Sequence, residues 1–265
     1  MNKIELIGRL TRDPDVRYSQ GDNSMAIARY TLAVNRRFKS ENQPDADFIS
    51  CVALGKNGEF AEKYLHQGMK IAVVGSINID QSVETDRIPR KGETIAGQSL
   101  QYTPGGKGAN QAVAMGRLGA EVVFFGCVGD DANGKAMLEN LESQGVSTTH
   151  IQTIENVPTG IALITVGDDD NTIIIVSGAN HYVDKPYIDK IKHYLTEFDL
   201  VVLQNEIPKE TNLYVIDFCN QNHIPVLFNP APIEGVDMDI IEKVTYFTPN
   251  EHEAVLIFGD ELSTE

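Results

Sequence analysis

The sequence predicts an α/β fold, with a doubly wound parallel sheet over residues 70–265 and a smaller β segment before it. Apolar runs alternate with amphipathic stretches from Lys70 onwards, as strands and helices do in a doubly wound sheet. The first seventy residues instead hold several strand patterns and one helical pattern, which is typical of a small β-barrel. The charge also changes: residues 1–70 hold 11 basic and 9 acidic side chains, whereas residues 71–265 hold 11 basic and 29 acidic side chains. This change indicates two segments with different partners.

Length and composition set the broad class of protein. The 265 residues suffice for one large domain or two smaller ones, and a hydrophobic content of 42% fits a globular chain. No apolar run reaches the length of a membrane span, and Met1–Asp15 does not resemble a signal peptide. The widely spaced Cys51, Cys127 and Cys219 predict neither a disulfide framework nor a zinc site. We therefore expect a cytoplasmic protein with no membrane partner.

In the first part, the apolar and polar residues alternate along Met25–Phe38, which is the period of a half-buried strand. Further strands are predicted at Ile4–Gly8 and Phe48–Leu54, and an amphipathic helix at Asn57–Gln67. A run of strands with one helix indicates a small barrel and not an α/β unit.

The second part begins with the near-continuous apolar run Lys70–Ile77, which indicates a buried parallel strand. Gly145 is predicted to end a helix as its C-cap. Residues 167–170 are predicted to join two strands in a hairpin. The expected helices are Gly108–Leu118, Asp131–Gln144, Lys185–Leu195, Lys209–Gln221 and Glu251–Ile257. The expected strands are Glu121–Cys127, Thr159–Val166, Thr172–Val176, Leu200–Gln204, Pro225–Asn229 and Val244–Thr248.

The segment Thr103–Ala114 carries three glycines at a predicted loop-to-helix junction. Glycine lets the backbone approach a ligand closely, and a helix N-terminus adds unpaired N–H groups and a partial positive charge. Asn110 can donate and accept at once, which suits vicinal hydroxyls. The pattern favours a site for a small hydroxyl-rich ligand, although a glycine-rich turn that only starts a helix remains the alternative. The P-loop pattern is absent, because Gly108 follows Lys107.

Polar side chains follow several predicted strands, where the ligands of a doubly wound sheet collect. Asp80 and Glu206 could each accept two hydroxyl donors and so hold a sugar diol. We expect the turn after Pro104 to fold back over Asn78 and Asp80. The alternative for each residue alone is a helix cap or a turn former. The polar residues at strand ends are Asn78, Asp80, Asn205, Glu206, Asn229, Asn250 and Glu253.

Blocks in this order resemble ribokinase, within the wider PfkB-type sugar-kinase family. They are Val74–Asp80, Gly92–Thr94, Gly105–Ala114, Gly129–Asp131, Ser177–Asn180, Leu203–Glu206, Asn229–Pro232 and Thr248–Glu251. The resemblance implies ATP-dependent phosphorylation of ribose at its 5-hydroxyl, with Mg²⁺. It assigns ribose contacts to Asn78, Asp80, Gly106, Lys107, Asn110 and Glu206. It also assigns the ATP phosphates to Asn250 and water-mediated Mg²⁺ binding to Glu253.

The resemblance further implies a small β lid over the sugar, formed near Ile95–Tyr102 and by the hairpin Thr159–Val176, which also makes a dimer interface. The family takes its catalytic aspartate from a Gly-Ala-Gly-Asp turn far downstream. The sequence ends at Glu265 before any such turn, and Phe258–Asp260 is too early to supply it. We therefore assign no catalytic base to this chain and expect impaired phosphoryl transfer.

Residues 1–70 carry interleaved basic and aromatic side chains, the chemistry that holds single-stranded nucleic acid. The blocks Ile7–Pro14, Tyr30–Arg36 and Asp47–Val52 resemble bacterial single-stranded DNA-binding protein, a homotetrameric OB-fold family. The resemblance assigns base stacking to Phe38 and Phe48, while a third position carries Leu54. The adjacent cations Arg36 and Arg37 are the best local candidates for phosphate contacts. The alternative is a solvated strand end with a buried Phe, and the family's closing strands are missing.

The two parts meet at Gly68–Gly75 without a flexible linker, which gives a partial OB-fold segment over 1–69 and a kinase-like domain over 70–265. We expect the α/β sheet to keep the shared strand, because a central parallel strand buries more apolar area than a barrel edge. The leading function is an impaired ribokinase-like enzyme fused to a DNA-binding-like segment. The alternative is a single-stranded DNA-binding module with a passenger sugar-binding domain. A third is a recombination product without a selected function.

Overall fold

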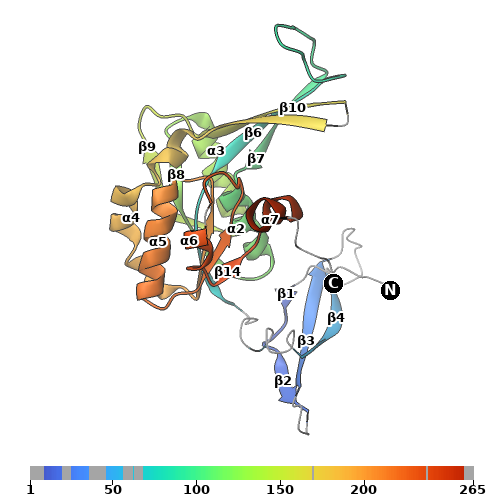
Figure 1. Cartoon of the computed structure of the whole chain (residues 1–265), viewed down its shortest axis with the longest axis vertical. Coiled ribbons are helices and arrows are strands. Elements are labelled where there is room, and N and C mark those ends of the chain that lie inside the picture. Colours follow the sequence, from blue (N-terminus) through green and yellow to red (C-terminus); the bar gives the residue numbers. More distant parts are fainter. Residues whose placement is uncertain are drawn as a thin grey trace. The chain divides into compact units, whose positions relative to one another are not determined.

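The computed structural model describes residues 9–19, 25–35, 46–55, 62, 68–168, 170–236 and 238–259. The chain divides into two compact units (Figure 1). The first comprises Met1–Met69 with Met115–Glu121, and the second comprises Lys70–Ala114 with Val122–Glu265.

The second unit is built on a six-stranded sheet in the order β14-β13-β12-β5-β8-β9. Strand β12 pairs in parallel with both β5 and β13, and the pairs β8–β9 and β13–β14 are also parallel. This confirms the predicted parallel sheet. The strands are β5 (Lys70–Val74), β8 (Glu121–Gly129), β9 (Ser147–Ile154), β12 (Leu200–Gln204), β13 (Val226–Asn229) and β14 (Tyr246–Phe247).

Helices connect these strands, and Figure 1 shows α4 and α5 next to one another on one side of the unit. The predicted helix Lys185–Leu195 is shorter than expected, because α4 ends at Ile191 and a separate 3₁₀ turn follows. The helical elements are α2 (Lys107–Arg117), α3 (Ala132–Ser143), η1 (Gly178–Tyr182), α4 (Lys185–Ile191), η2 (Tyr194–Glu197), α5 (Lys209–Gln221), α6 (Met238–Ile241) and α7 (Glu251–Phe258).

The shared strand at the junction belongs to the α/β sheet, as predicted. Strand β5 pairs with β12 from Ile71 to Val74, and these four residues are buried. Ala72 and Val74 join a core that includes the fully buried side chains of Phe125 and Phe228. Each such side chain contributes about 1.5–3 kcal/mol through burial, which favours this pairing.

A second sheet has the order β11-β10-β6-β7 and is called the lid sheet below. Its strands are β6 (Asn78–Glu84), β7 (Ser99–Gly105), β10 (Gly160–Gly167) and β11 (Asp170–Val176). Strands β10 and β11 form the predicted antiparallel hairpin. Asn78 and Asp80 were expected at the end of a strand, but both lie within a strand of their own. The chain leaves β5 and enters a new strand, β6, which pairs with β10 and β7.

The first unit holds a four-stranded antiparallel sheet in which β3 pairs with each of the other strands. Strands β3 and β4 confirm the predictions for Met25–Phe38 and Phe48–Leu54 where the residues are described, and residues 36–38 lie outside the described residues. The predicted strand Ile4–Gly8 lies outside the described residues, as does the helix Asn57–Gln67 apart from residue 62. The strands are β1 (Arg9–Leu10), β2 (Asp15–Tyr18), β3 (Ala26–Asn35) and β4 (Ala46–Leu54).

Candidate functional site

The glycine-rich segment forms a tight turn between the lid sheet and a helix. Strand β7 ends at Gly105, Gly106 has a φ of +90°, and α2 begins at Lys107. A Cβ atom on Gly106 would lie 2.8 Å from both the backbone nitrogen of Asn78 and the backbone carbonyl oxygen of Ser76. The position therefore requires glycine, both for its backbone conformation and for its close approach to the connection between β5 and β6.

This turn lies directly beside the two polar residues of β6. In the antiparallel pairing of β6 with β7, Asn78 is opposite Gly105 and Asp80 is opposite Thr103. The Asp80 carboxylate covers Gly105 so closely that a Cβ there would overlap it. The predicted approach of the turn to Asn78 and Asp80 is confirmed.

Glu206 reaches the same turn from the end of β12. Its Oε2 atom accepts a hydrogen bond from the Ser76 hydroxyl at 2.5 Å and another from the Lys107 backbone N–H at 2.9 Å. The Gly108 N–H donates to the Ser76 hydroxyl oxygen, Oγ, at 3.3 Å. Glu206 and Ser76 thus cap the N-terminus of α2 from distant parts of the chain, where a negative charge is favoured. The helix-cap alternative holds for Glu206, although the helix that it caps is not the one that follows it.

The charges at the turn act on one another. Burial raises the pKa of Asp80, the neighbouring Glu206 raises that pKa further, and Lys107 lowers it. Two carboxylates and one ammonium therefore share a partly buried space. Such a set accepts hydrogen bonds from hydroxyl groups and returns one from the ammonium.

The first turns of α2 carry Asn110, which is a predicted sugar contact, and Gln111, which holds the helix to the sheet. Asn110 is exposed, and its backbone N–H bonds to the Gly106 oxygen at 2.9 Å. On the buried side, Gln204 Nε2 donates to Gln111 Oε1 at 2.8 Å. This bond ties the helix to β12, the strand that precedes Glu206.

Two residues at this end of the sheet were missed as site residues from the sequence. Ser76 and Asn180 are both buried, and the side chain of each bonds to a predicted sugar residue. Only their place within the resembling blocks Val74–Asp80 and Ser177–Asn180 hinted at a role.

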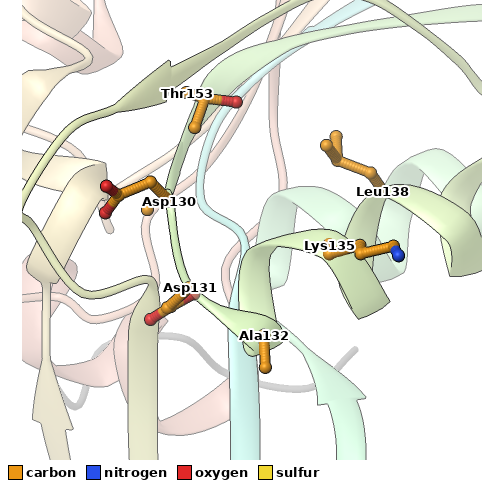
Figure 2. Close-up of a pocket in the computed structure, with 7 residues that line it drawn as sticks. Asp130, Asp131, Ala132, Lys135, Leu138 and Thr153 are labelled. Atoms are coloured by element: carbon orange, nitrogen blue, oxygen red, sulfur yellow. The ribbon is translucent and has the colours of Figure 1, made fainter.

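Pockets lie at two places among the described residues of the second unit. One of about 290 Å³ is lined by Asn180 and Glu206 together with Ile175 of β11. The other, of about 390 Å³, lies where β8 turns into α3; Figure 2 shows Asp131 at this bend. The carboxylate of Asp131 is held by the protein itself: it accepts hydrogen bonds from the Gly134 N–H at 2.8 Å and from both the N–H and the hydroxyl of Thr159. We therefore assign no ligand to the second pocket.

Asn250 and Glu253 form a reciprocal capping box on α7. The Glu253 N–H donates to Asn250 Oδ1 at 2.8 Å, and the Asn250 N–H donates to Glu253 Oε2 at 2.9 Å. Among the residues that the structure describes, no three His, Cys, Asp or Glu side chains converge to hold a metal ion. Glu253 alone does not make a Mg²⁺ site, so we derive no chemical step through the ion.

One of the four predicted DNA-contacting residues can be located. Phe48 is 66% exposed on β4, whereas Arg36, Arg37 and Phe38 lie outside the described residues. Val52 and Leu54 are exposed on the same face of β4, and the register of β3 with β4 sets Arg29 opposite Val52. An exposed ring, two exposed aliphatic side chains and a cation therefore share one face of this sheet.

Comparison with known proteins gives the family. The profile described as pfkB family carbohydrate kinase matches residues 69–265, and the chain belongs to this family. A profile of the single-strand binding protein family matches residues 1–102. The two matches overlap over residues 69–102, which include β5 of the parallel sheet and β6 of the lid sheet. Within the described residues, no helix is both long and apolar enough to cross a membrane.

Several individual relatives are ribokinases, and others are deoxyribokinases. The ribokinase of Lactococcus lactis is 47% identical over 190 residues, which cover 71% of this chain and 63% of the relative. The crystal structure of ribokinase from Thermotoga maritima is 38% identical with a TM-score of 0.63, covering 72% of this chain and 64% of that one. The structure of Arabidopsis thaliana ribokinase complexed with ribose and ATP is 33% identical with a TM-score of 0.62, over 73% and 64%. The chain thus spans just under two thirds of these relatives' length.

Proposed function

We propose that the second unit binds ribose at the turn between β7 and α2. The observation that carries this proposal is the convergence of Asp80, Lys107 and Glu206 from three separate elements on one glycine turn. Ribokinases from several organisms are similar to this part of the chain, and one solved relative is a complex with ribose and ATP.

The chemistry of the proposed sugar contacts is complementary. The carboxylates of Asp80 and Glu206 accept hydrogen bonds from hydroxyls, the Lys107 ammonium donates, and Asn110 does both. Because Glu206 Oε2 already holds Ser76 and the α2 N-terminus, its Oε1 is the atom that we assign to the sugar. The backbone at Gly106 completes the set, since no side chain separates it from a ligand. Asn78 is the sixth proposed contact.

The proposed reaction is transfer of the ATP γ-phosphoryl group to the 5-hydroxyl of ribose. Asn250 is our candidate for a contact with the phosphates, and Glu253 for a water-mediated contact with Mg²⁺. The first turn of α7 holds two carboxylates, Glu251 and Glu253, which repel phosphate, so a nucleotide there needs a counter-cation. We expect this polypeptide to bind ribose.

Titration calorimetry with ribose tests the proposed site. Asp80→Asn is expected to weaken ribose binding about 10- to 100-fold, because hydrogen bonds to a charged group are lost. Glu84→Gln is the matched control, since Glu84 is an exposed carboxylate on the same strand. A wild-type chain that does not bind ribose, or equal effects of the two substitutions, would refute the site. A coupled ADP-release assay with Mg²⁺ measures turnover, and ADP release that does not depend on ribose would contradict the proposed reaction.

A second function is proposed for the first unit, namely single-stranded DNA binding. Its support is the exposed Phe48 on a face that also carries the exposed Arg29. Stacking of a base on Phe48 is worth about 1–3 kcal/mol, so Phe48→Ala should weaken binding about 5- to 100-fold. Ser50→Ala, on the same strand face, is the control. Fluorescence anisotropy at two salt concentrations measures this, and binding that ignores salt or Phe48 would exclude the proposal.

The remaining proposals concern assembly and location. We propose that the lid sheet pairs with a second copy of the chain, because Ile173, Ile174 and Ile175 of the edge strand β11 are all exposed. Sedimentation equilibrium tests this: Ile174→Glu should give monomers if the edge is an interface. The cytoplasmic location rests on the three free cysteines, which are distant in the sequence.

A further inference from the structure

Asn180 is not one of the proposed sugar contacts, but its buried side chain is hydrogen-bonded to the start of the lid sheet. It lies in η1, is 1% exposed, and is separated by more than 100 residues from its partners. Its Oδ1 accepts from the Ile77 N–H at 2.9 Å. Its Nδ2 donates to the Ile77 carbonyl at 3.2 Å and to Asn78 Oδ1 at 2.7 Å.

These three bonds fix the direction of both amides. A backbone N–H can only donate, so the Ile77 nitrogen must face the oxygen of Asn180, and the Asn180 amino group then faces Asn78. That amino group can only donate, so Asn78 must present its oxygen to Asn180. No described residue accepts a hydrogen bond from Asn78 Nδ2 in return. The Asn78 amino group is therefore the part of this side chain left for a ligand.

We propose that Asn180 is a positioning residue that makes Asn78 a hydrogen-bond donor toward the sugar. The inference rests on the proposed ribose site and deepens it. A hydroxyl that donates to the carboxylate of Asp80 or Glu206 keeps lone pairs that can accept from Asn78. The hydroxyl facing Asn78 is thus recognised as an acceptor, whereas the carboxylates recognise their hydroxyls as donors.

The isosteric variant Asn180→Asp reverses this polarity. The first oxygen of the new carboxylate still accepts from Ile77 N–H, but its second oxygen would face the oxygen of Asn78. The Asn78 amide must then rotate, donate to that carboxylate and turn its own oxygen to the sugar. Ribose binding should weaken about 10-fold or more, because Asn78 then presents an acceptor to the hydroxyl that it faced with a donor. Asn220→Asp is the matched control: the Asn220 Nδ2 donates to the Lys243 carbonyl at 2.9 Å, and neither residue is a proposed sugar contact.

A series of ribose analogues separates polarity from simple loss of structure. In each analogue one hydroxyl is replaced by fluorine, which only accepts, or by hydrogen, which does neither. At one position the fluoro sugar should bind wild-type chain at least about threefold more tightly than the deoxy sugar, and Asn180→Asp should remove this difference. The proposal is overturned if no position shows the difference, or if the variant keeps it.

A measurement without sugar separates this inference from the proposed function. Neutron diffraction from the deuterated wild-type protein locates the deuterons of both amides. Deuterons on the Asn78 atom that points away from Asn180 support the inference, even if ribose does not bind and the proposed function fails. Deuterons between Asn78 and Asn180 that belong to Asn78 overturn it, whatever the sugar does. This measurement also decides the matter if Asn180→Asp does not fold.

Discussion

The bond between Ser76 and Glu206 allows a quantitative test of how the site is assembled. Glu206→Ala removes a charge-assisted bond from Ser76, worth about 1.5–3 kcal/mol, and the cap on Lys107 N–H, worth about 1 kcal/mol. The free energy of unfolding should fall by about 2–4 kcal/mol. For a domain of this size, each kcal/mol lowers the thermal midpoint by about 2–4 °C, so a loss of about 5–15 °C is expected.

The double-mutant cycle isolates the pair. Ser76→Ala and Glu206→Ala should each destabilise, and the double variant should cost less than the sum by about 1–3 kcal/mol. Ser99 and Glu84 form the matched control, because their bond has the same chemistry at 3.1 Å but is exposed. Water competes for that bond, so its coupling should stay below about 0.5 kcal/mol.

Circular dichroism at 222 nm during urea unfolding measures the cycle. The helices α3 to α7 belong to the second unit, which holds the site, so its unfolding contributes to this signal. If the coupling of Ser76 with Glu206 is no larger than that of the exposed control pair, the capping of α2 by Glu206 is energetically unimportant.

Three further predictions follow from particular residues. Since the pKa of Asp80 is raised, ribose affinity should begin to fall on acidification at a higher pH than the pKa of an ordinary carboxyl would give, as measured by ribose titrations. The contribution of Asp80 to the free energy of unfolding should instead rise on acidification, because the folded state binds this proton more tightly than the unfolded state. Asp80→Asn should remove both effects. Burial raises the pKa of Cys127 and Cys219 to about 12, so a thiol reagent at pH 8 should label them only after denaturation. In urea unfolding, Gly106→Ala should cost more than about 2 kcal/mol, and Gly145→Ala, with a similar φ but open space, about 1 kcal/mol.

Elements with a strong local pattern could be predicted from the sequence. Strand Leu200–Gln204 and helix Lys209–Gln221 have the predicted bounds, because an apolar run and an amphipathic period mark each of them. Strands Asn78–Glu84 and Ser147–Ile154 were missed because polar residues interrupt both. Their strand conformation comes from backbone pairing with distant segments, as where β6 lies between β7 and β10.

The candidate site was predictable as a set of residues but not as an arrangement. The glycines, Lys107 and the carboxylate of Glu206 stand out in the sequence because few side chains suit such chemistry. Their contacts do not, since Lys107 and Glu206 are 99 residues apart and Ser76 and Glu206 are 130 apart. For Asn250 and Glu253 the contact is local instead: the two residues are three apart and form a capping box, which explains this pair without a phosphate ligand.

The sequence by itself determined which segments are apolar enough to form the parallel sheet, and where a backbone without side chains can meet a ligand. Both are local properties of composition and spacing. Only the tertiary structure decided which oxygen of Glu206 is already occupied and which end of the Asn78 amide is left over. Hydrogen-bond direction is set by the partner, and here each partner comes from a different part of the chain.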